Sequence, residues 1–212
     1  MPTPVYYANC PDYTPEHLQS ALGGILPGQI DAFGGVSHKR IMLKPNLLAW
    51  RRADDIACVH PKLIVETARF FLDAGAKEVA LLENPAVQTA PAIIRAMGID
   101  EELKKLGVHV ANFSDYKRLP LPPEVKFHNI ELAAEFLEYD AVADIAKAKT
   151  HAMMILTLCV KNLFGLVKGC DRMGWHLAVG RDFAKFADML LDIHLSVRPR
   201  FNILDAVTCM EG

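Results

Sequence analysis

The chain is organised around Lys147-Ala-Lys-Thr-His151, which closes one apolar segment, and Lys161-Asn-Leu-Phe-Gly165, which closes the next. The residues from Val142 to Ala148 are mostly small or branched and apolar, which predicts a buried strand of a parallel sheet. The run from Met153 to Val160 is apolar on nearly all sides and is predicted to be a buried helix. A buried ammonium group must be paired or lose its proton, so the cations that close these segments require an explanation.

Lys161 needs a carboxylate, an anionic ligand or an exit to water. Gly165 resembles a helix stop, and a lysine in the last turn of a helix is favoured by the helix dipole. For Lys161 alone, a solvated surface lysine and a ligand-binding lysine therefore remain equally open. Together with Lys147, Lys149, His151 and Asn162, the pattern favours an anion-binding site.

The rest of the chain alternates predicted strands and helices. A first helix is predicted from Thr14-Pro15 to Gly23-Gly24, followed by a linker or loop over residues 23–35. The other predicted elements are strands at Arg40–Leu43, Val79–Leu82, Val108–Phe113 and Phe201–Leu204, helices after His60-Pro61, from Pro91 to Leu106 in two pieces, at Leu132–Tyr139 and after Asp182, and a loop at Gly169–Gly180.

These elements predict an α/β fold with a mostly parallel sheet of about five strands and helices on both faces. Residues 1–212 are expected to form a single α/β domain. Within it, residues 1–38 are interpreted as an N-terminal extension and residues 116–131 as a surface hairpin or flap.

Composition excludes several classes of function. Apolar residues make up 51% of the chain and the formal net charge is -2, so disorder and nucleic-acid binding are not indicated. No stretch is long enough for a membrane span and the start lacks a signal peptide, so a cytoplasmic protein without membrane contact is expected. The five cysteines are scattered without a Cys-x-x-Cys pair, which argues against a disulfide framework or a locally bound iron–sulfur cluster.

The candidate site lies where parallel strands end, because loops and helix N-termini converge there. The polar residues at these positions are Lys44, Asn46, Glu83, Asn84, Lys147, Lys149, His151 and Asp205. His151 and His176 are candidate acid/base groups, with metal ligation as a weaker option and no metal site predicted. No Walker loop, Gly-x-Gly-x-x-Gly motif, Gly-x-Ser-x-Gly elbow or His-Glu-x-x-His motif occurs.

These residues resemble a known family. Lys44-Pro-Asn46, Lys147-Ala-Lys-Thr-His151, Lys161-Asn-Leu-Phe-Gly165 and Met210-Glu-Gly212 are similar to the domain-of-unknown-function family three-six-two, over about Lys44 to Gly212. Members of that family often carry a ferredoxin-like module with two four-iron (4Fe-4S) clusters after this domain. The resemblance implies a redox-associated protein, with any cluster in a separate module or partner, and names no reaction.

The sequence departs from the family pattern at two places. Asp144-Ile-Ala-Lys147 stands where members typically read Asn-Leu-Pro-Lys, so a carboxylate replaces an amide. The family pattern also normally continues past Met210-Glu-Gly212, so the chain is expected to be a partial domain.

Three hypotheses follow, and the sequence leaves open whether the protein is an enzyme. In the first, Lys44, Lys147, Lys149 and Lys161 bind a small phosphate or carboxylate ligand, Asn46, Asn162 and Asp205 line the site, and His151, His176 or Lys161 acts chemically. In the second, the domain is a non-catalytic adaptor that docks a ferredoxin-like partner. In the third, His151, His176 and Asp205 support metal-dependent chemistry.

Overall fold

The computed structural model describes residues 4–50, 56–119, 122–179 and 182–211. It contains a six-stranded sheet in the order β3-β2-β1-β6, with β8 and β7 both pairing with β6. Every pairing in this sheet is parallel except that of β7 with the end of β6. The predicted mostly parallel α/β fold is therefore confirmed.

The elements follow in this order: α1 Pro15–Phe33, β1 Arg40–Pro45, α2 Pro61–Asp73, β2 Glu78–Leu82, α3 Ala90–Ala96, α4 Asp100–Lys105, β3 His109–Ala111, β4 Tyr116–Arg118, β5 Glu131–Ala133, the 3-10 turn η1 Glu135–Glu138, β6 Ala141–His151, β7 Ile155–Thr157, α5 Cys159–Asn162, the 3-10 turn η2 Leu163–Leu166, α6 Gly169–Val179, α7 Phe183–Val197 and β8 Phe201–Met210.

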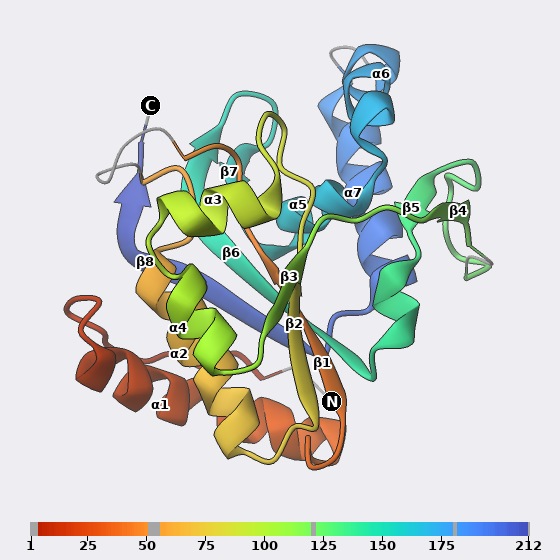
Figure 1. Cartoon of the computed structure of the whole chain (residues 1–212). Coiled ribbons are helices and arrows are strands. Elements are labelled where there is room, and N and C mark those ends of the chain that lie inside the picture. The colour runs from red at the N-terminus through yellow and green to blue at the C-terminus, as the bar shows by residue number, and fades with distance from the viewer. Residues whose placement is uncertain (1–3, 51–55, 120–121, 180–181, 212) are drawn as a thin grey trace.

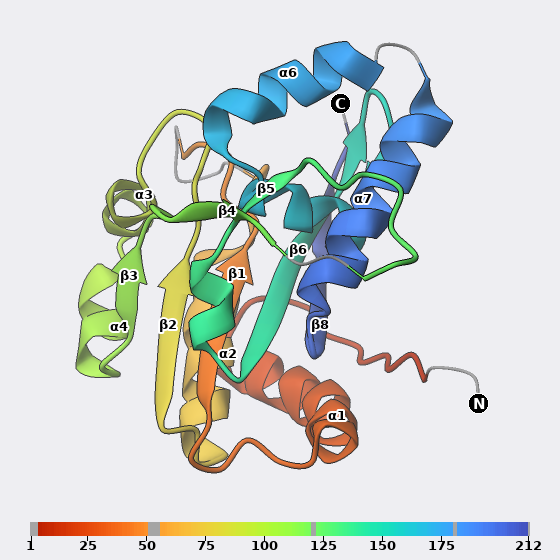
Figure 2. The ribbon, with the colours of Figure 1, turned by 90° about the vertical axis from the view of Figure 1, so that its right-hand side faces the viewer.

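The sheet buries a core on each face because successive side chains of a strand point to opposite sides. Ile41 and Leu43 of β1 pack in the core beneath α1 to α4, whereas Met42 packs in the core beneath α7. Figure 2 shows α7 and the β4–β5 hairpin on one side of the sheet and α2 on the other. Buried strands of this kind need no polar alternation, which is why they were recognisable as apolar runs.

Several segments differ from the sequence-based expectation. The predicted helix over Met153–Val160 is wrong, because the chain instead turns after His151, returns as β7 and then enters the short helix α5. The predicted helix at Leu132–Tyr139 is also wrong, because strand β5 ends at Ala133 and the 3-10 turn η1 follows it. β7 pairs with the end of β6 and β5 pairs with β4, and helical periodicity does not reveal such strand pairings.

Two predicted loops are helices. Residues 23–35 continue α1 to Phe33 with Pro27 inside the helix, and Leu18, Leu22 and Leu26 are buried in the core. The segment Gly169–Gly180, predicted as a loop, instead forms α6 over Gly169–Val179. Burial of an apolar face compensates for weak helix propensity in α1, since tertiary packing routinely outweighs propensity.

Strand β6 positions the candidate site. It runs from Ala141 to His151, so Lys147 and Lys149 lie within a strand rather than beyond its end. Beyond the end of β1, β7 takes the place beside β6, while β8 continues on the other side with a register shift between Lys147 and Lys149. Both ribbon views place α6 at the end of the molecule toward which the parallel strands point (Figures 1 and 2).

Candidate functional site

A buried ion pair lies on the α7 side of the sheet, at the end of β1. Lys44 is 1% exposed and its Nζ contacts Glu83 Oε2, which follows directly on β2. Lys44 Nζ also donates to Asn162 Oδ1 at 3.1 Å, so α5 is attached to the same pair. The charge of Lys44 is therefore balanced within the protein itself.

Asn162 of α5 holds the strand ends together. Its Nδ2 lies 2.6 Å from Asp144 Oδ1 and 3.2 Å from the carbonyl oxygen of Lys44. Complete burial raises the pKa of the Asp144 carboxyl to about 7, although Lys44 and Asn162 oppose the shift. Asp144 Oδ2 has no hydrogen-bond partner among the described residues, which suits a protonated carboxyl.

The glycine of the Lys-Asn-Leu-Phe-Gly motif is required by this pair. A Cβ atom on Gly165 would lie 2.7 Å from Glu83 Oε1 and 2.8 Å from Lys44 Nζ. Neither atom can withdraw easily, because both belong to a buried ion pair. The motif thus brings the backbone of η2 into direct contact with the charges at the ends of β1 and β2.

A second buried ion pair lies on the α2 side of the sheet. Lys147 Nζ is 3.0 Å from Asp205 Oδ2 of β8, and each of the two residues is only 1% exposed. Tyr13 donates its hydroxyl to Asp205 Oδ1 at 2.7 Å and accepts from Lys147 Nζ at 3.1 Å. The backbone N–H of His60 donates to Asp205 Oδ2 at 3.0 Å, and the His60 ring stacks on Tyr13 with centroids 3.7 Å apart.

Lys149 and Asn46 form the connection between the strand ends and the loop after β1. Lys149 Nζ donates to Asn46 Oδ1 at 2.8 Å and to the carbonyl oxygen of Ala57 at 2.6 Å. Asn46 Nδ2 in turn donates to Asn162 Oδ1 at 2.7 Å. A continuous chain of hydrogen bonds therefore joins Lys149, Asn46, Asn162 and Lys44.

Lys161 has a different environment. Its Nζ lies over the rings of Phe164 and Phe186, 4.8 Å and 5.7 Å from their centroids. Within the described parts of the chain, it makes no ion pair or hydrogen bond. Aromatic faces attract the cation, but they replace neither a carboxylate nor water as its partner.

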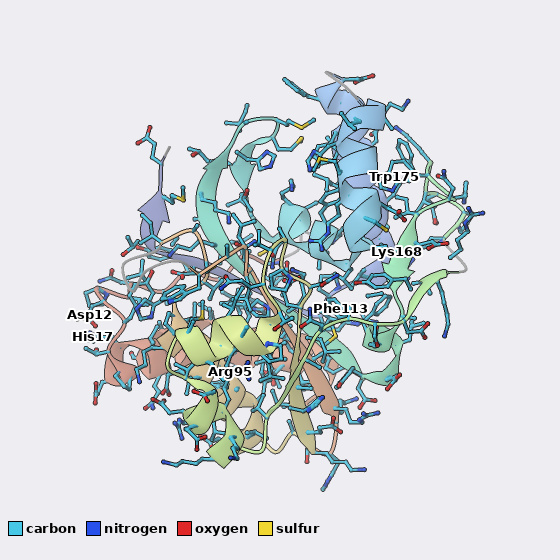
Figure 3. The ribbon with its side chains drawn as sticks, turned by 45° about the horizontal axis from the view of Figure 1, so that its top comes forward. Asp12, His17, Arg95, Phe113, Lys168 and Trp175 are labelled. Carbon is cyan, nitrogen blue, oxygen red and sulfur yellow. The ribbon has the colours of Figure 1, made fainter. Side chains whose placement is uncertain are left out.

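Among the described residues, the charges that shift the pKa of Lys161 are positive. Burial and the neighbouring cations Lys149, Lys44 and Arg172 lower the pKa of Lys161 to about 8. Arg172 comes from α6 and donates from a terminal nitrogen to the carbonyl oxygen of Asn84 at 2.7 Å. Figure 3 shows the neighbouring Trp175 on the same helix, with Lys168 just before it.

The two candidate histidines lie beside this cationic group. His151 Nδ1 accepts the backbone N–H groups of Met153 and Met154, each at 3.2 Å, which leaves Nε2 for any ligand. Burial, Lys161, His176 and Lys149 lower the pKa of His151 to about 4. His151 is therefore neutral near pH 7.

His176 packs on the same rings as Lys161. Its ring centroid is 5.2 Å from that of Phe164 and 4.9 Å from that of Phe186, and its Nδ1 lies 3.2 Å from Met153 Sδ. Burial and then the charge of Lys161 lower the pKa of His176. The amine and the imidazole therefore share one partly apolar site.

The structure brings most of the predicted site residues together, in two groups. Lys44, Asn46, Lys149 and Asn162 form one network near Lys161, His151 and His176, whereas Lys147 and Asp205 pair on the opposite face. Arg172 and Tyr13 also belong to these groups and were not predicted from the sequence. Arg172 and His176 have the i, i+4 spacing of one helix face, a signal that was overlooked because their segment was interpreted as a loop.

The described residues do not form a metal or cluster site. No group of three or more His, Cys, Asp and Glu among them is placed to hold a metal ion. Asp205 is already bound by Lys147, Tyr13 and the backbone of His60. The donor set present therefore fits neither a four-iron cluster nor the hypothesis of His/Asp metal chemistry.

No helix within the described ranges is both long and apolar enough to cross a membrane.

The fold and the site define an open-sheet α/β domain with a lysine- and histidine-rich carboxyl edge. The chain belongs to the family described as Domain of unknown function (DUF362), which matches residues 41–212. The thylakoid-associated protein sll1697 of Synechocystis sp. is 30% identical over 188 residues, covering 86% of this chain and 58% of the relative. The chain thus spans little more than half of that relative's length.

A crystal structure of a Thermotoga maritima protein from the Northeast Structural Genomics Consortium has a similar fold. The TM-score is 0.50 at 16% sequence identity, over 88% of this chain and 49% of the other. At this identity the similarity concerns the fold alone.

Proposed function

We propose that the chain binds a small anion, a phosphate or carboxylate group, beside Lys161 at the carboxyl edge of the sheet. The observation that carries this proposal is the environment of Lys161, an ammonium group with cationic and aromatic neighbours and no carboxylate partner in the described part of the chain. Desolvated positive charge of this kind costs free energy unless an anion balances it. A bound anion would supply the missing charge.

The contacts of the other lysines indicate which cations would bind the ligand. Lys44 and Lys147 already have buried carboxylate partners, so their charge is balanced internally. Lys149 and Arg172 are the further cations that act on Lys161, and both are attached to backbone carbonyl oxygens that fix their position. In this proposal Lys149, Lys161 and Arg172 attract the anion, while the Lys44 and Lys147 pairs hold the strands that carry the site.

The amides and imidazoles would orient the ligand and carry protons. Asn46 is bonded to both Lys149 and Asn162, so it would position the ammonium of Lys149. His151 Nε2 and the His176 ring lie in the same electrostatic environment as Lys161. Because both imidazoles are held neutral, they would donate or accept hydrogen bonds without adding charge.

Isothermal titration calorimetry with inorganic phosphate and with oxalate tests the proposal at pH 7. We expect saturable binding to the parent chain and a loss of at least about tenfold in affinity for Lys161→Met, since about 1.4 kcal/mol corresponds to a factor of ten. Lys168→Met is the matched control, because Lys168 is a half-exposed lysine that already pairs with Glu131. Equal binding by the parent chain and Lys161→Met would overturn the proposal.

We further propose that the domain acts within a redox-associated protein, as the family resemblance suggests. An adaptor that docks a ferredoxin-like partner is the second candidate, and exposed apolar residues favour it. Met173 and Leu177 of α6 and Ile155 of β7 are 70%, 76% and 79% exposed. A pull-down with a purified two-cluster ferredoxin distinguishes the two roles, since an adaptor binds it and a small-anion site alone does not.

We infer a cytoplasmic location. Because a relative is named as thylakoid-associated, the amount of protein in the membrane fraction should be compared with the amount in the cytoplasmic fraction. Cell fractionation, followed by a salt wash of the membranes, tests this inference. Recovery in the membrane fraction after the wash would contradict it.

A further inference from the structure

Four side chains, one each from α5, η2, α6 and α7, meet at one place. Lys161 Nζ lies 4.8 Å and 5.7 Å from the ring centroids of Phe164 and Phe186. The His176 ring packs on the same two rings at 5.2 Å and 4.9 Å. An amine, an imidazole and two aromatic faces thus form a site that is partly apolar and partly cationic.

Lys161 differs from Lys44 and Lys147 in the partners of its ammonium group. Lys44 and Lys147 each contact a buried carboxylate. Lys161 has no carboxylate partner in the described ranges, and its Nζ lies over the rings of Phe164 and Phe186. No carboxylate in the described ranges therefore stabilises the charged form of the Lys161 amine.

This environment makes the amine nucleophilic. The pKa of Lys161 is lowered from 10.5 to about 8 by burial, then by Lys149, Lys44 and Arg172. At pH 7 about 10% of this amine is neutral, against about 0.03% for a lysine with an ordinary pKa, roughly a 300-fold difference. A desolvated lysine beside other cations is a recurring arrangement for covalent catalysis on carbonyl compounds.

We propose that Lys161 Nζ forms an imine with a small aldehyde or ketone that also carries a carboxylate or phosphate group. The proposal rests on the anion site described above and adds a reaction to it. The nitrogen lone pair bonds to the carbonyl carbon, and the carbonyl oxygen leaves as water together with the two hydrogens of the neutral amine. The step needs no net proton, oxidant or reductant.

The substrate class follows from the charges around the amine. Lys149 and Arg172 supply positive charge beside Lys161, which favours a substrate whose carbonyl lies one or two bonds from an anionic group. The rings of Phe164 and Phe186 cover the amine on one side and limit its hydration. A 2-oxo acid and a phosphorylated ketone both satisfy these requirements.

Reductive trapping tests the proposal on the full chain. The protein is incubated at pH 7 with sodium cyanoborohydride and pyruvate, dihydroxyacetone phosphate or the uncharged dihydroxyacetone, and the modified lysines are identified by peptide mass spectrometry. We expect Lys161 to be modified at least about tenfold faster than any other lysine, and at least about tenfold faster by one of the anionic probes than by dihydroxyacetone. Which anionic probe reacts distinguishes carboxylate from phosphate substrates.

Two variants define the controls. Lys161→Arg keeps the charge but cannot form an imine, so the fast adduct should disappear. Lys104→Arg changes a lysine of α4 that is 78% exposed, and the fast adduct should remain. Mapping on the parent chain keeps the test valid even if Lys161→Arg does not fold.

Two results would overturn the inference. Adducts spread evenly over the surface lysines would show that Lys161 is not a nucleophile, and equal rates with dihydroxyacetone would remove the anionic substrate class and with it the proposal. If phosphate still binds at Lys161 in calorimetry, the imine fails while the anion site stands. If phosphate binding is also absent, both fail.

Discussion

Gly165 is placed so close to the Lys44–Glu83 pair that its hydrogen cannot be replaced by a methyl group without movement. We predict that Gly165→Ala destabilises the fold by about 1–3 kcal/mol through overpacking, and by more if the buried ion pair separates. The free energy of unfolding in urea measures the effect. Gly174→Ala is the matched control, since nothing lies within 4 Å of a Cβ on Gly174 in α6 and an alanine there should be neutral or slightly stabilising. A loss of stability no greater than that of the control would contradict the tight contact.

Asp144 predicts a pH dependence of stability. Burial raises the pKa of its carboxyl from 3.8 to about 7 in the folded chain. Between these two pH values the folded state keeps a proton that the unfolded state has lost, so the stability falls as the pH rises from about 4 to about 7. Above pH 7 the buried carboxylate is ionised, and it lowers the stability of the fold by a constant amount.

Asp144→Asn removes that cost, because an amide stays neutral when it is buried. We expect the variant to be more stable than the parent chain above pH 7, by up to about 4 kcal/mol at roughly 1.4 kcal/mol per tenfold change in acidity. The difference should shrink toward zero near pH 4, where both side chains are neutral. Urea unfolding at pH 4.5, 6 and 8 measures it, and a difference that does not change with pH would refute the assignment to Asp144.

The residues at the strand ends could be identified from the sequence, but their partners could not. Lys44 and Lys147 were recognised as unusual because each directly follows or closes an apolar run. Their balance by Glu83 and Asp205 depends on which strands are neighbours and on which face each side chain lies. Periodicity within one segment contains neither fact, so an internal ion pair and a ligand-binding lysine look alike in the sequence.

At the scale of elements, the long strands and the helix after His60 were predictable and the region after His151 was not. Strand β6 and helix α2 have apolar patterns that match their burial. The turn after His151 is stabilised by the bonds from Met153 and Met154 to His151 Nδ1, contacts between a side chain and the backbone that redirect an apolar run into β7. Such local bonds compete with helix formation, and hydrophobicity does not register them.

The segment before α1 is attached to β8 through Tyr13. Its hydroxyl donates to Asp205 and accepts from Lys147 Nζ and from the Thr208 N–H, the last at 3.1 Å. We predict that Tyr13→Phe costs about 1–3 kcal/mol, because charged groups lose a hydrogen-bond partner in a buried site. Hydrogen exchange at the Thr208 amide should become faster. Tyr7→Phe, at a residue that is 87% exposed, is the control, and unchanged exchange at Thr208 in Tyr13→Phe would contradict the attachment.

At the scale of the whole molecule, the two faces of the sheet have different electrostatic roles. The Lys147–Asp205 pair on the α2 side is balanced and enclosed, while the α7 side carries the Lys44–Glu83 pair and, beside it, Lys161 with its cationic neighbours. The ammonium of Lys161, which has no carboxylate partner among the described residues, attracts anions. The stability of the whole molecule should therefore respond to anions in a manner that depends on the charge state of Lys161.

Lys161 has a lowered pKa, so the unfolded state holds its proton between about pH 8 and 10.5 while the folded state has released it. This group therefore adds stability as the pH rises through that window, and below pH 8 its charge opposes folding. Phosphate that binds beside the ammonium should stabilise the fold most at pH 7 and progressively less toward pH 10, as the amine loses its charge. Thermal unfolding of the parent chain and of Lys161→Met, with and without phosphate at constant ionic strength, measures this coupling. In Lys161→Met the phosphate effect should be small at every pH, and an effect of equal size in both chains would assign the anion response to a different part of the molecule.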